Sequence, residues 1–184
     1  ARFELAGYEA DDILGTLSLE AEKQGLDVVL ITGDKDSFQL VSDKTIVYQP
    51  VTRAGRSDTQ IVDVNYIKDK YKVQPEQLID IKAIMGDSSD NIPGVRGIGE
   101  KGAISLISQF GSLENVYEHL DDVTSSHAKK LVENREMAEL SYDLATICRS
   151  VPIPGGIEQF KIKDTDKQAL HQLLLDLQYC YDIT

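Results

Sequence analysis

The first third of the chain alternates between helix-like and strand-like patterns of apolar residues. Between Tyr8 and Gly25, apolar side chains recur at the three- and four-residue spacing of a helix that buries one face. Residues 27–32 then form a continuous, mostly β-branched apolar run, which is typical of a parallel strand buried on both faces. A short helix, a second strand and a hairpin or loop are predicted at 37–41, 45–49 and 51–59. This order predicts an α/β region with a partial parallel sheet.

From Asp63 onwards the apolar period becomes helical. Helices are predicted at 63–71, 75–85, 99–110, 113–120, 125–135 and 136–147. Asp80 is expected on the solvent-facing side of its helix. After a Pro-Gly break at 152–156, a last helix begins near Asp166, and its leucine stripe is expected to be core: Leu170, Leu173, Leu174 and Leu177. The second part of the chain is therefore predicted to be a small helical subdomain.

Composition is ordinary for a globular protein and excludes few functions. The 184 residues are 41% hydrophobic and 27% charged, which suits one substantial core. No apolar run approaches the ~18 residues of a membrane span, and the first residues lack a signal-peptide pattern, so we expect a cytoplasmic protein without membrane contact. Cys148 and Cys180 lie far apart, with no Cys or His at metal-ligand spacing, so they are interpreted as reduced packing residues.

The net charge of −12 argues against nucleic-acid binding unless the acids themselves gather cations. Seven of the 31 acidic residues fall in three tight groups at element boundaries: Glu9, Asp11 and Asp12; Asp34 and Asp36; Asp87 and Asp90. Each group alone could be a helix cap or a turn. Together they would repel one another without metal, and oxygen-only ligands favour Mg²⁺ or Mn²⁺. Two such ions about 4 Å apart can promote phosphodiester hydrolysis.

A glycine-rich segment follows the last acid pair. Residues 94–103 have the apolar-x-Gly-apolar-Gly pattern of a helix-hairpin-helix, in which backbone N–H groups at a helix start approach phosphates. A plain turn between packed helices is the alternative. The hairpin interpretation predicts a DNA-binding segment comprising Gly94, Val95, Arg96, Gly97, Ile98, Gly99 and Lys101.

The stretches at 7–12, 32–36 and 86–101 resemble, in order and spacing, the motifs of the 5′-nuclease domain of bacterial DNA polymerase I, in the flap endonuclease superfamily. The resemblance covers residues 1 to about 150. It implies a PIN-like α/β nuclease core whose C-terminal part is 1–62. It further implies a helical subdomain with a helix-hairpin-helix (helix-3-turn-helix) motif at 63–150 and a C-terminal extension at 151–184.

By this resemblance all seven acids are catalytic metal ligands for two Mg²⁺ or Mn²⁺ ions, the first three mainly around one ion and the last four around the other. The hairpin would hold duplex DNA, with K⁺ on its backbone carbonyls. The implied activity is hydrolysis of DNA at 5′ flaps or nicks (5′–3′ exonuclease and flap endonuclease) in replication and repair. The implied partner is a covalently linked polymerase portion.

Two departures from the family pattern stand out. Gly102 occupies a position where the family usually has Thr. The family also begins earlier, with a strand carrying a metal-binding Asp and a basic arch, so we expect this chain to be a fragment that binds metal weakly and cleaves poorly. Two alternatives remain: a non-catalytic DNA-binding module, and a haloacid-dehalogenase-type phosphatase with Asp34 as nucleophile. The phosphatase explains neither the hairpin nor the acids at Glu9 to Asp12.

Overall fold

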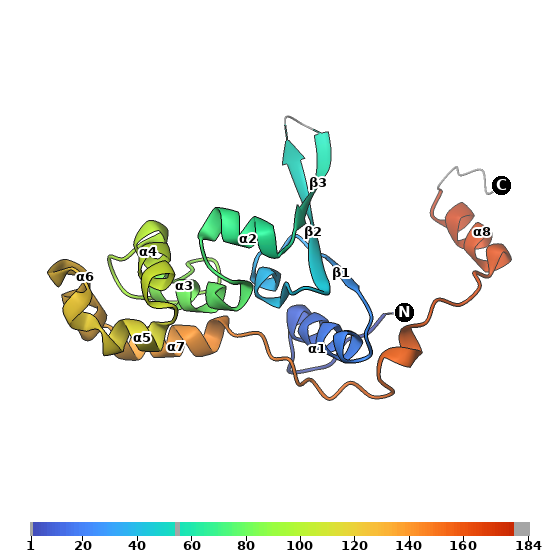
Figure 1. Cartoon of the computed structure of the whole chain (residues 1–184). Helices are drawn as coiled ribbons and strands as arrows, with labels where there is room; N and C mark the ends of the chain where they lie inside the picture. Colours follow the sequence, from blue (N-terminus) through green and yellow to red (C-terminus); the bar gives the residue numbers. More distant parts are fainter. Residues whose placement is uncertain (1, 54–55, 179–184) are drawn as a thin grey trace.

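The computed structural model describes residues 2–53 and 56–178 (Figure 1). Cys180, interpreted above as a packing residue, lies outside these ranges, and so does part of the turn at 51–59. The described chain begins with helix α1 (Ala10–Lys23) and strand β1 (Val28–Ile31), as the apolar pattern predicts. A short 3-10 helix, η1 (Asp36–Leu40), follows where a short helix is expected.

The sheet has three described strands in the order β1-β2-β3. Strand β2 (Thr45–Arg53) pairs in parallel with β1, with Val28 opposite Thr45. It also pairs antiparallel with β3 (Arg56–Val62), and this two-stranded ribbon projects from the body in Figure 1. At its base Val47 and Val62 face each other in full burial. The structure confirms an α/β region in which a parallel pair is extended by a hairpin.

The expectation that β1 is buried on both faces is wrong for the described chain. Leu30 is buried, but Val29 is 49% and Ile31 is 73% exposed. Among the described strands β1 pairs with β2 alone, so it lies at an edge of the sheet and only one of its faces joins the core. The apolar run identified the strand correctly, and its surroundings determined which side chains are covered.

The helical part is organised around a short, central helix. Helix α2 (Val64–Tyr71) is capped by Asp63, whose carboxylate accepts a hydrogen bond from the Tyr66 N–H. Pro75 begins the 3-10 turn η2 (Pro75–Gln77), which leads into α3 (Leu78–Met85). Helices α4 (Glu100–Phe110), α5 (Leu113–Glu118), α6 (Ser125–Glu133) and α7 (Arg135–Ala145) follow, with the 3-10 turn η3 (Leu120–Asp122) between α5 and α6.

Helix α3 contacts α4, α5 and α7, and its Ile81, Ala83 and Ile84 are almost completely buried. One hydrophobic cluster runs from Leu30 in the sheet through this helix to Ile147. The helix therefore joins the sheet region to the helical region and fixes the position of the loop that follows it.

Asp80 on α3 is not on the solvent-facing side, contrary to expectation. It is buried, and its Oδ1 accepts a hydrogen bond of 2.8 Å from the Leu113 N–H in the first turn of α5. This N–H has no partner within its own helix, so a carboxylate from another helix can satisfy it. Burial raises the pKa of Asp80 above its ordinary value of 3.8.

The raised pKa of Asp80 predicts how stability depends on pH. The folded protein holds this proton more tightly than the unfolded chain, so the favourable contribution is present below pH 3.8 and is lost as the pH rises through the folded-state pKa. Asp80→Asn, which keeps an acceptor oxygen but no charge, should therefore raise Tm at pH 7 and lose that gain near pH 4. Thermal unfolding of both proteins between pH 4 and pH 7 measures this difference in Tm. A lower Tm for Asp80→Asn than for wild type at pH 7 would contradict the prediction. Asp80→Ala, which leaves the Leu113 N–H unpaired, should lower Tm at both pH values.

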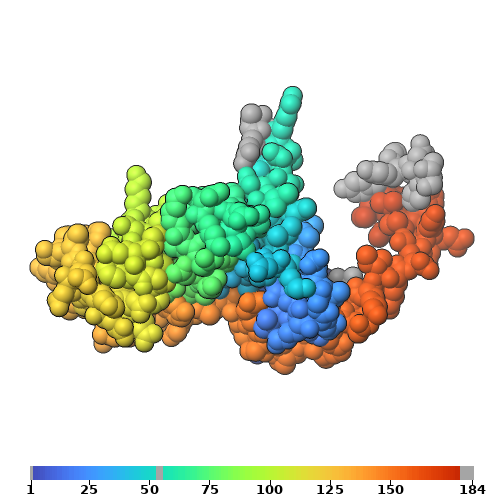
Figure 2. Space-filling view, viewed as in Figure 1, coloured from blue at the N-terminus to red at the C-terminus, as the bar shows by residue number. Residues whose placement is uncertain are grey.

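The tail leads away from the body to α8, as Figures 1 and 2 show. After the 3-10 turn η4 (Ile157–Phe160), helix α8 (Lys167–Asp176) is capped by Asp166, as predicted. Its leucine stripe is not core: Leu170, Leu173 and Leu177 are all exposed. No helix in residues 2–53 and 56–178 has the length and apolar character that crossing a membrane requires.

Candidate metal centre and nucleic-acid interface

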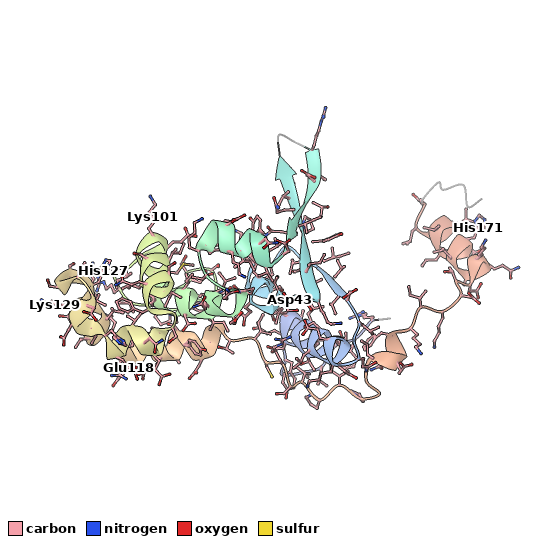
Figure 3. The ribbon with its side chains drawn as sticks, in the orientation of Figure 1. Asp43, Lys101, Glu118, His127, Lys129 and His171 are labelled. Atoms are coloured by element: carbon pink, nitrogen blue, oxygen red, sulfur yellow. The ribbon has the colours of Figure 1, made fainter. Side chains whose placement is uncertain are left out.

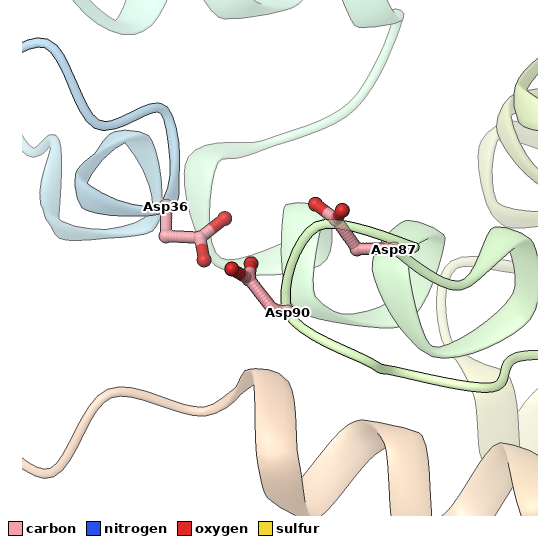
Figure 4. A group of neighbouring side chains, drawn as sticks. All are labelled: Asp36, Asp87 and Asp90. Atoms are coloured by element: carbon pink, nitrogen blue, oxygen red, sulfur yellow. The ribbon is translucent and has the colours of Figure 1, made fainter.

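Three of the predicted ligands meet where the sheet region joins the helical region. Asp36 begins η1 just after β1, while Asp87 and Asp90 lie in the loop after α3. One carboxylate oxygen from each lies within 4.8 Å of the others (Figure 4). In that view the Asp36 and Asp90 carboxylates point toward each other from different segments.

The loop that carries Asp87 and Asp90 is held by its own backbone. Asp87 and Ile92 exchange two backbone hydrogen bonds of 2.9 and 2.8 Å. The Asp87 carboxylate also accepts hydrogen bonds from the backbone N–H and the hydroxyl of Ser89. These bonds close a tight turn and lower the pKa of Asp87, chiefly through the Ser89 hydroxyl, so this carboxylate is ionised at neutral pH.

A lysine that the sequence analysis did not single out lies among these carboxylates. Lys82 Nζ is 2.5 Å from Asp36 Oδ2, 3.2 Å from Asp87 Oδ2 and 2.9 Å from Asp90 Oδ2. Its side chain is only 9% exposed. The sequence carries one signal: Lys82 lies four residues after Leu78, on the apolar side of its helix, and a lysine buried there is nearly always paired with an anion.

The charges in this group do not balance. Burial alone favours the neutral amine, but hydrogen bonds from Lys82 to Asp36, Asp90 and Asp87 outweigh it and raise the lysine pKa above its ordinary range. Burial also raises the pKa of Asp36, and repulsion from Asp34 and Asp90 adds to it, although Lys82 opposes the shift. One ammonium facing three carboxylates leaves a surplus of negative charge, and an all-oxygen donor set of this kind fits a hard divalent cation.

The first acidic group lies beside the same cluster. Glu9, Asp11 and Asp12 line a pocket of about 270 Å³ together with Asp36 and Asp90, and Ile92 and residues 144–147 form its remaining wall. Burial raises the pKa of Asp11, assisted by the neighbouring charges of Glu9, Asp12 and Asp34. Carboxylates from α1, η1 and the 87–92 loop therefore share one concave site.

Two of the predicted ligands also have structural roles. Asp12 accepts hydrogen bonds from the Glu9 N–H at 3.1 Å and from the Cys148 N–H at 2.8 Å, which ties α1 to the segment after α7. Asp34 accepts a 2.9 Å hydrogen bond from the Asp36 N–H and does not line the pocket, although its charge acts on Asp11.

Asp87 lines a second pocket, on the side of Tyr71 and Glu100. The division of the seven acids between two ions stays a prediction.

The predicted hairpin at 94–103 is formed, and it is anchored to α3 by its backbone. The Val95 N–H donates to the Ile84 carbonyl at 2.7 Å, and the Gly94 N–H donates to Ser141 Oγ at 2.9 Å. Gly97 has a φ of +86°, which turns the chain toward the start of α4.

The side chains of the hairpin divide into anchors and exposed groups. Val95 and Ile98 are buried and serve as anchors. Arg96, Gly97, Gly99 and Lys101 are exposed. Figure 3 shows Lys101 projecting from α4. The exposed groups can contact a phosphate backbone, as the motif predicts.

The unusual glycine of the hairpin helix packs closely against Ile98. A Cβ atom at Gly102 would lie 2.9 Å from Ile98 Cγ2, so Ile98 would have to shift, while the His127 ring on α6 would lie at an ordinary contact distance of 3.4 Å. From the same helix, Lys130 Nζ donates a 2.8 Å hydrogen bond to the Gly97 carbonyl. One hairpin carbonyl thus already faces a cation, at the place where K⁺ is expected.

Comparison with known families matches almost the whole chain. Residues 1–72 match a family described as 5′-3′ exonuclease, N-terminal resolvase-like domain, and residues 73–168 match 5′-3′ exonuclease, C-terminal SAM fold. DNA polymerase I of Bacillus subtilis (strain 168) is 44% identical over 180 residues, which are 97% of this chain and 20% of that protein. Thermostable DNA polymerase I of Thermus filiformis is 40% identical over 179 residues, 97% of this chain and 21% of that protein. The chain spans about a fifth of these relatives.

Solved structures show the same fold. Zinc-bound T5 5′-exonuclease matches with a TM-score of 0.69 at 28% identity, covering 79% of this chain and 52% of that one. The catalytic core of Rad2 in complex with DNA matches with a TM-score of 0.57 at 17% identity, covering 89% of this chain and 55% of that one, which shows likeness of fold alone.

Proposed function

The chain belongs to the 5′-3′ exonuclease family, and from this premise we propose that it supplies acidic ligands and a DNA-binding hairpin to a divalent-metal-dependent 5′ nuclease. The observation that carries the proposal is the convergence of carboxylates from α1, η1 and the 87–92 loop on one pocket, with the hairpin following directly in sequence. Family membership rules out the haloacid-dehalogenase-type phosphatase.

The proposed substrate is DNA with a 5′ flap or nick, met in replication and repair. We propose that the protein acts in the cytoplasm and that, like its relatives, it is linked to a polymerase portion. The zinc-bound T5 exonuclease supports a divalent metal, and the all-carboxylate donor set favours Mg²⁺ or Mn²⁺.

Each part of the site has a proposed task. Asp36, Asp87 and Asp90 would hold one cation, while Glu9, Asp11 and Asp12 would hold the other, with Asp34 at the margin. Such cations would activate a water molecule and stabilise the charge that develops on the phosphate. The exposed hairpin groups would grip the duplex backbone without reading its sequence.

The connection between the DNA-binding hairpin and the metal site is short and rigid. Gly86 and Gly94 approach so closely that a Cβ atom at Gly94 would lie 2.6 Å from the Gly86 Cα and closer still to the Gly86 nitrogen. This contact joins the end of α3 to the start of the hairpin. We propose that it sets the distance between the held duplex and the phosphodiester that is cut.

Cleavage of a 5′-labelled flap duplex by the chain tests the proposal. We expect slow release of short 5′ products that requires Mg²⁺ or Mn²⁺ and stops with EDTA, and less product from blunt duplex. Cleavage that continues in EDTA would contradict it. So would the absence of cleavage combined with no measurable Mn²⁺ binding.

A non-catalytic DNA-binding module is the second candidate, and the exposed Arg96 and Lys101 favour it. In either case Arg96→Ala and Lys101→Ala should each weaken binding of branched DNA and reduce the slope of log K against log salt by about 1, because each removes one phosphate contact. Lys23→Ala, which changes an exposed lysine at the end of α1, is the matched control. Fluorescence anisotropy at several salt concentrations measures the slope, and an unchanged slope in both hairpin variants would contradict the predicted contacts. DNA binding without any metal-dependent product would favour the module over the nuclease.

A further inference from the structure

Lys82 is the one group in contact with all three carboxylates of the Asp36, Asp87 and Asp90 cluster in the described chain. It extends from α3, whereas Asp36 begins η1 and the other two partners lie in the loop after α3. A single side chain therefore bridges two segments that are 46 residues apart in sequence.

Three carboxylates surround the ammonium group of the lysine. Nζ donates hydrogen bonds to Asp36 Oδ2 at 2.5 Å and to Asp90 Oδ2 at 2.9 Å, and Asp87 Oδ2 lies 3.2 Å away in an ion pair. The lysine side chain is 9% exposed, whereas the side chains of Asp36, Asp87 and Asp90 are 27%, 28% and 50% exposed, so water reaches the carboxylates but little of the ammonium. Without a cation between them, three carboxylates confined this closely would repel one another and separate.

We infer that Lys82 is a positioning residue, a built-in cation that keeps this half of the metal site assembled and competes with a divalent ion for its carboxylates. The inference rests on the proposed function only for the competition, since the assembly role concerns the folded chain itself. Two consequences follow. Loss of the ammonium should loosen the metal-free protein, and it should free the carboxylates to bind a divalent ion more tightly.

The test is Lys82→Met, which keeps most of the side-chain length and removes the charge. Thermal unfolding in EDTA should show Tm lowered by roughly 5–10 °C, because three partly exposed carboxylates lose the buried ammonium that lies between them. Titration with Mn²⁺, followed by the electron paramagnetic resonance signal of free Mn²⁺, should show affinity increased at least about tenfold. Saturating Mn²⁺ should restore most of the lost Tm, since it binds only the folded cluster.

Three further variants make the result specific. Lys35→Met removes the same charge one residue from Asp36, from an exposed lysine with no ion pair among the described residues, and should change neither quantity. Lys82→Arg keeps the charge and should retain low Mn²⁺ affinity. Adding Asp87→Asn to Lys82→Met should abolish the gain in affinity. If Lys82→Met does not fold, Lys82→Gln provides the uncharged variant.

Each outcome decides a separate point. An unchanged Tm in EDTA overturns the assembly role, and unchanged or weaker Mn²⁺ binding by a folded Lys82→Met overturns the competition. Failure of the proposed function looks different: neither wild type nor Lys82→Met binds Mn²⁺ or cleaves flap DNA, while the fall in Tm persists.

Discussion

Asp87→Asn combined with Asp90→Asn should abolish detectable flap cleavage, with a decrease of at least ~10³-fold. A bound divalent ion supplies several kcal/mol of stabilisation to the developing charge, and ~4 kcal/mol corresponds to about three powers of ten in rate. Both substitutions keep the side-chain size but remove two of the three carboxylates that converge on Lys82. Cleavage of a 5′-labelled flap duplex at saturating Mg²⁺, stopped at a series of times, measures the decrease in rate. Titration with Mn²⁺ should show that the variant also binds this ion more weakly.

The matched control for this pair is Asp121→Asn with Asp122→Asn. These two acids are exposed on η3, so the control makes the same change in net charge away from the cluster. It should leave both cleavage and Mn²⁺ affinity unchanged. Flap cleavage at the full wild-type rate by the Asp87 and Asp90 variant would refute the assignment of these residues as ligands.

Gly94→Ala should destabilise the protein by at least ~3 kcal/mol and uncouple the hairpin from the metal site. Gly94 has a φ of +62°, a conformation that costs a residue with a Cβ atom ~1–2 kcal/mol. The added Cβ would also lie 2.6 Å from the Gly86 Cα and closer still to the Gly86 nitrogen, and neither backbone atom can give way as a flexible side chain does. Relief requires the end of α3 and the hairpin to move apart.

Denaturant unfolding measures the loss in stability, and cleavage measured where both proteins are folded should fall with it. Gly99→Ala is the matched control within the same hairpin, because a Cβ atom added at Gly99 would meet nothing within 4 Å and the φ of this residue is −93°. It should keep wild-type stability. If Gly94→Ala kept wild-type stability, the end of α3 and the hairpin could move apart at little cost in free energy. That result would remove the basis for a fixed distance between the hairpin and the metal site.

Local patterns in the sequence were sufficient for most helices and for the acidic groups. Helices α1 and α2 and the start of α4 depend on contacts within a few residues, so spacing and capping predict them well. The same holds for the turn at 87–92 and for the hairpin glycines, whose conformations depend on local backbone geometry. The assignment of all seven acids as ligands and the domain boundaries stay predictions.

Burial and pairing depend on residues far away in sequence, and there the local pattern failed. The apolar run of β1 does not show that Ile31 lies exposed at a sheet edge, nor does the leucine stripe of α8 show that the helix projects from the body. The polarity of Asp80 predicted that its side chain is exposed to solvent. Its burial is accounted for by the Leu113 N–H of α5, which has no partner within its own helix and donates to the Asp80 carboxylate.

The sequence by itself determined the motifs and therefore the family, because short stretches of fixed spacing specify caps, turns and ligand types. Only the tertiary structure showed that Lys82, from a helix predicted by its apolar stripe, contacts the carboxylates of Asp36, Asp87 and Asp90. The physical reason is the distance along the sequence over which each of these effects acts. Helical periodicity and capping act over a few residues, while the charge balance of this cluster depends on segments that meet only when the chain has folded.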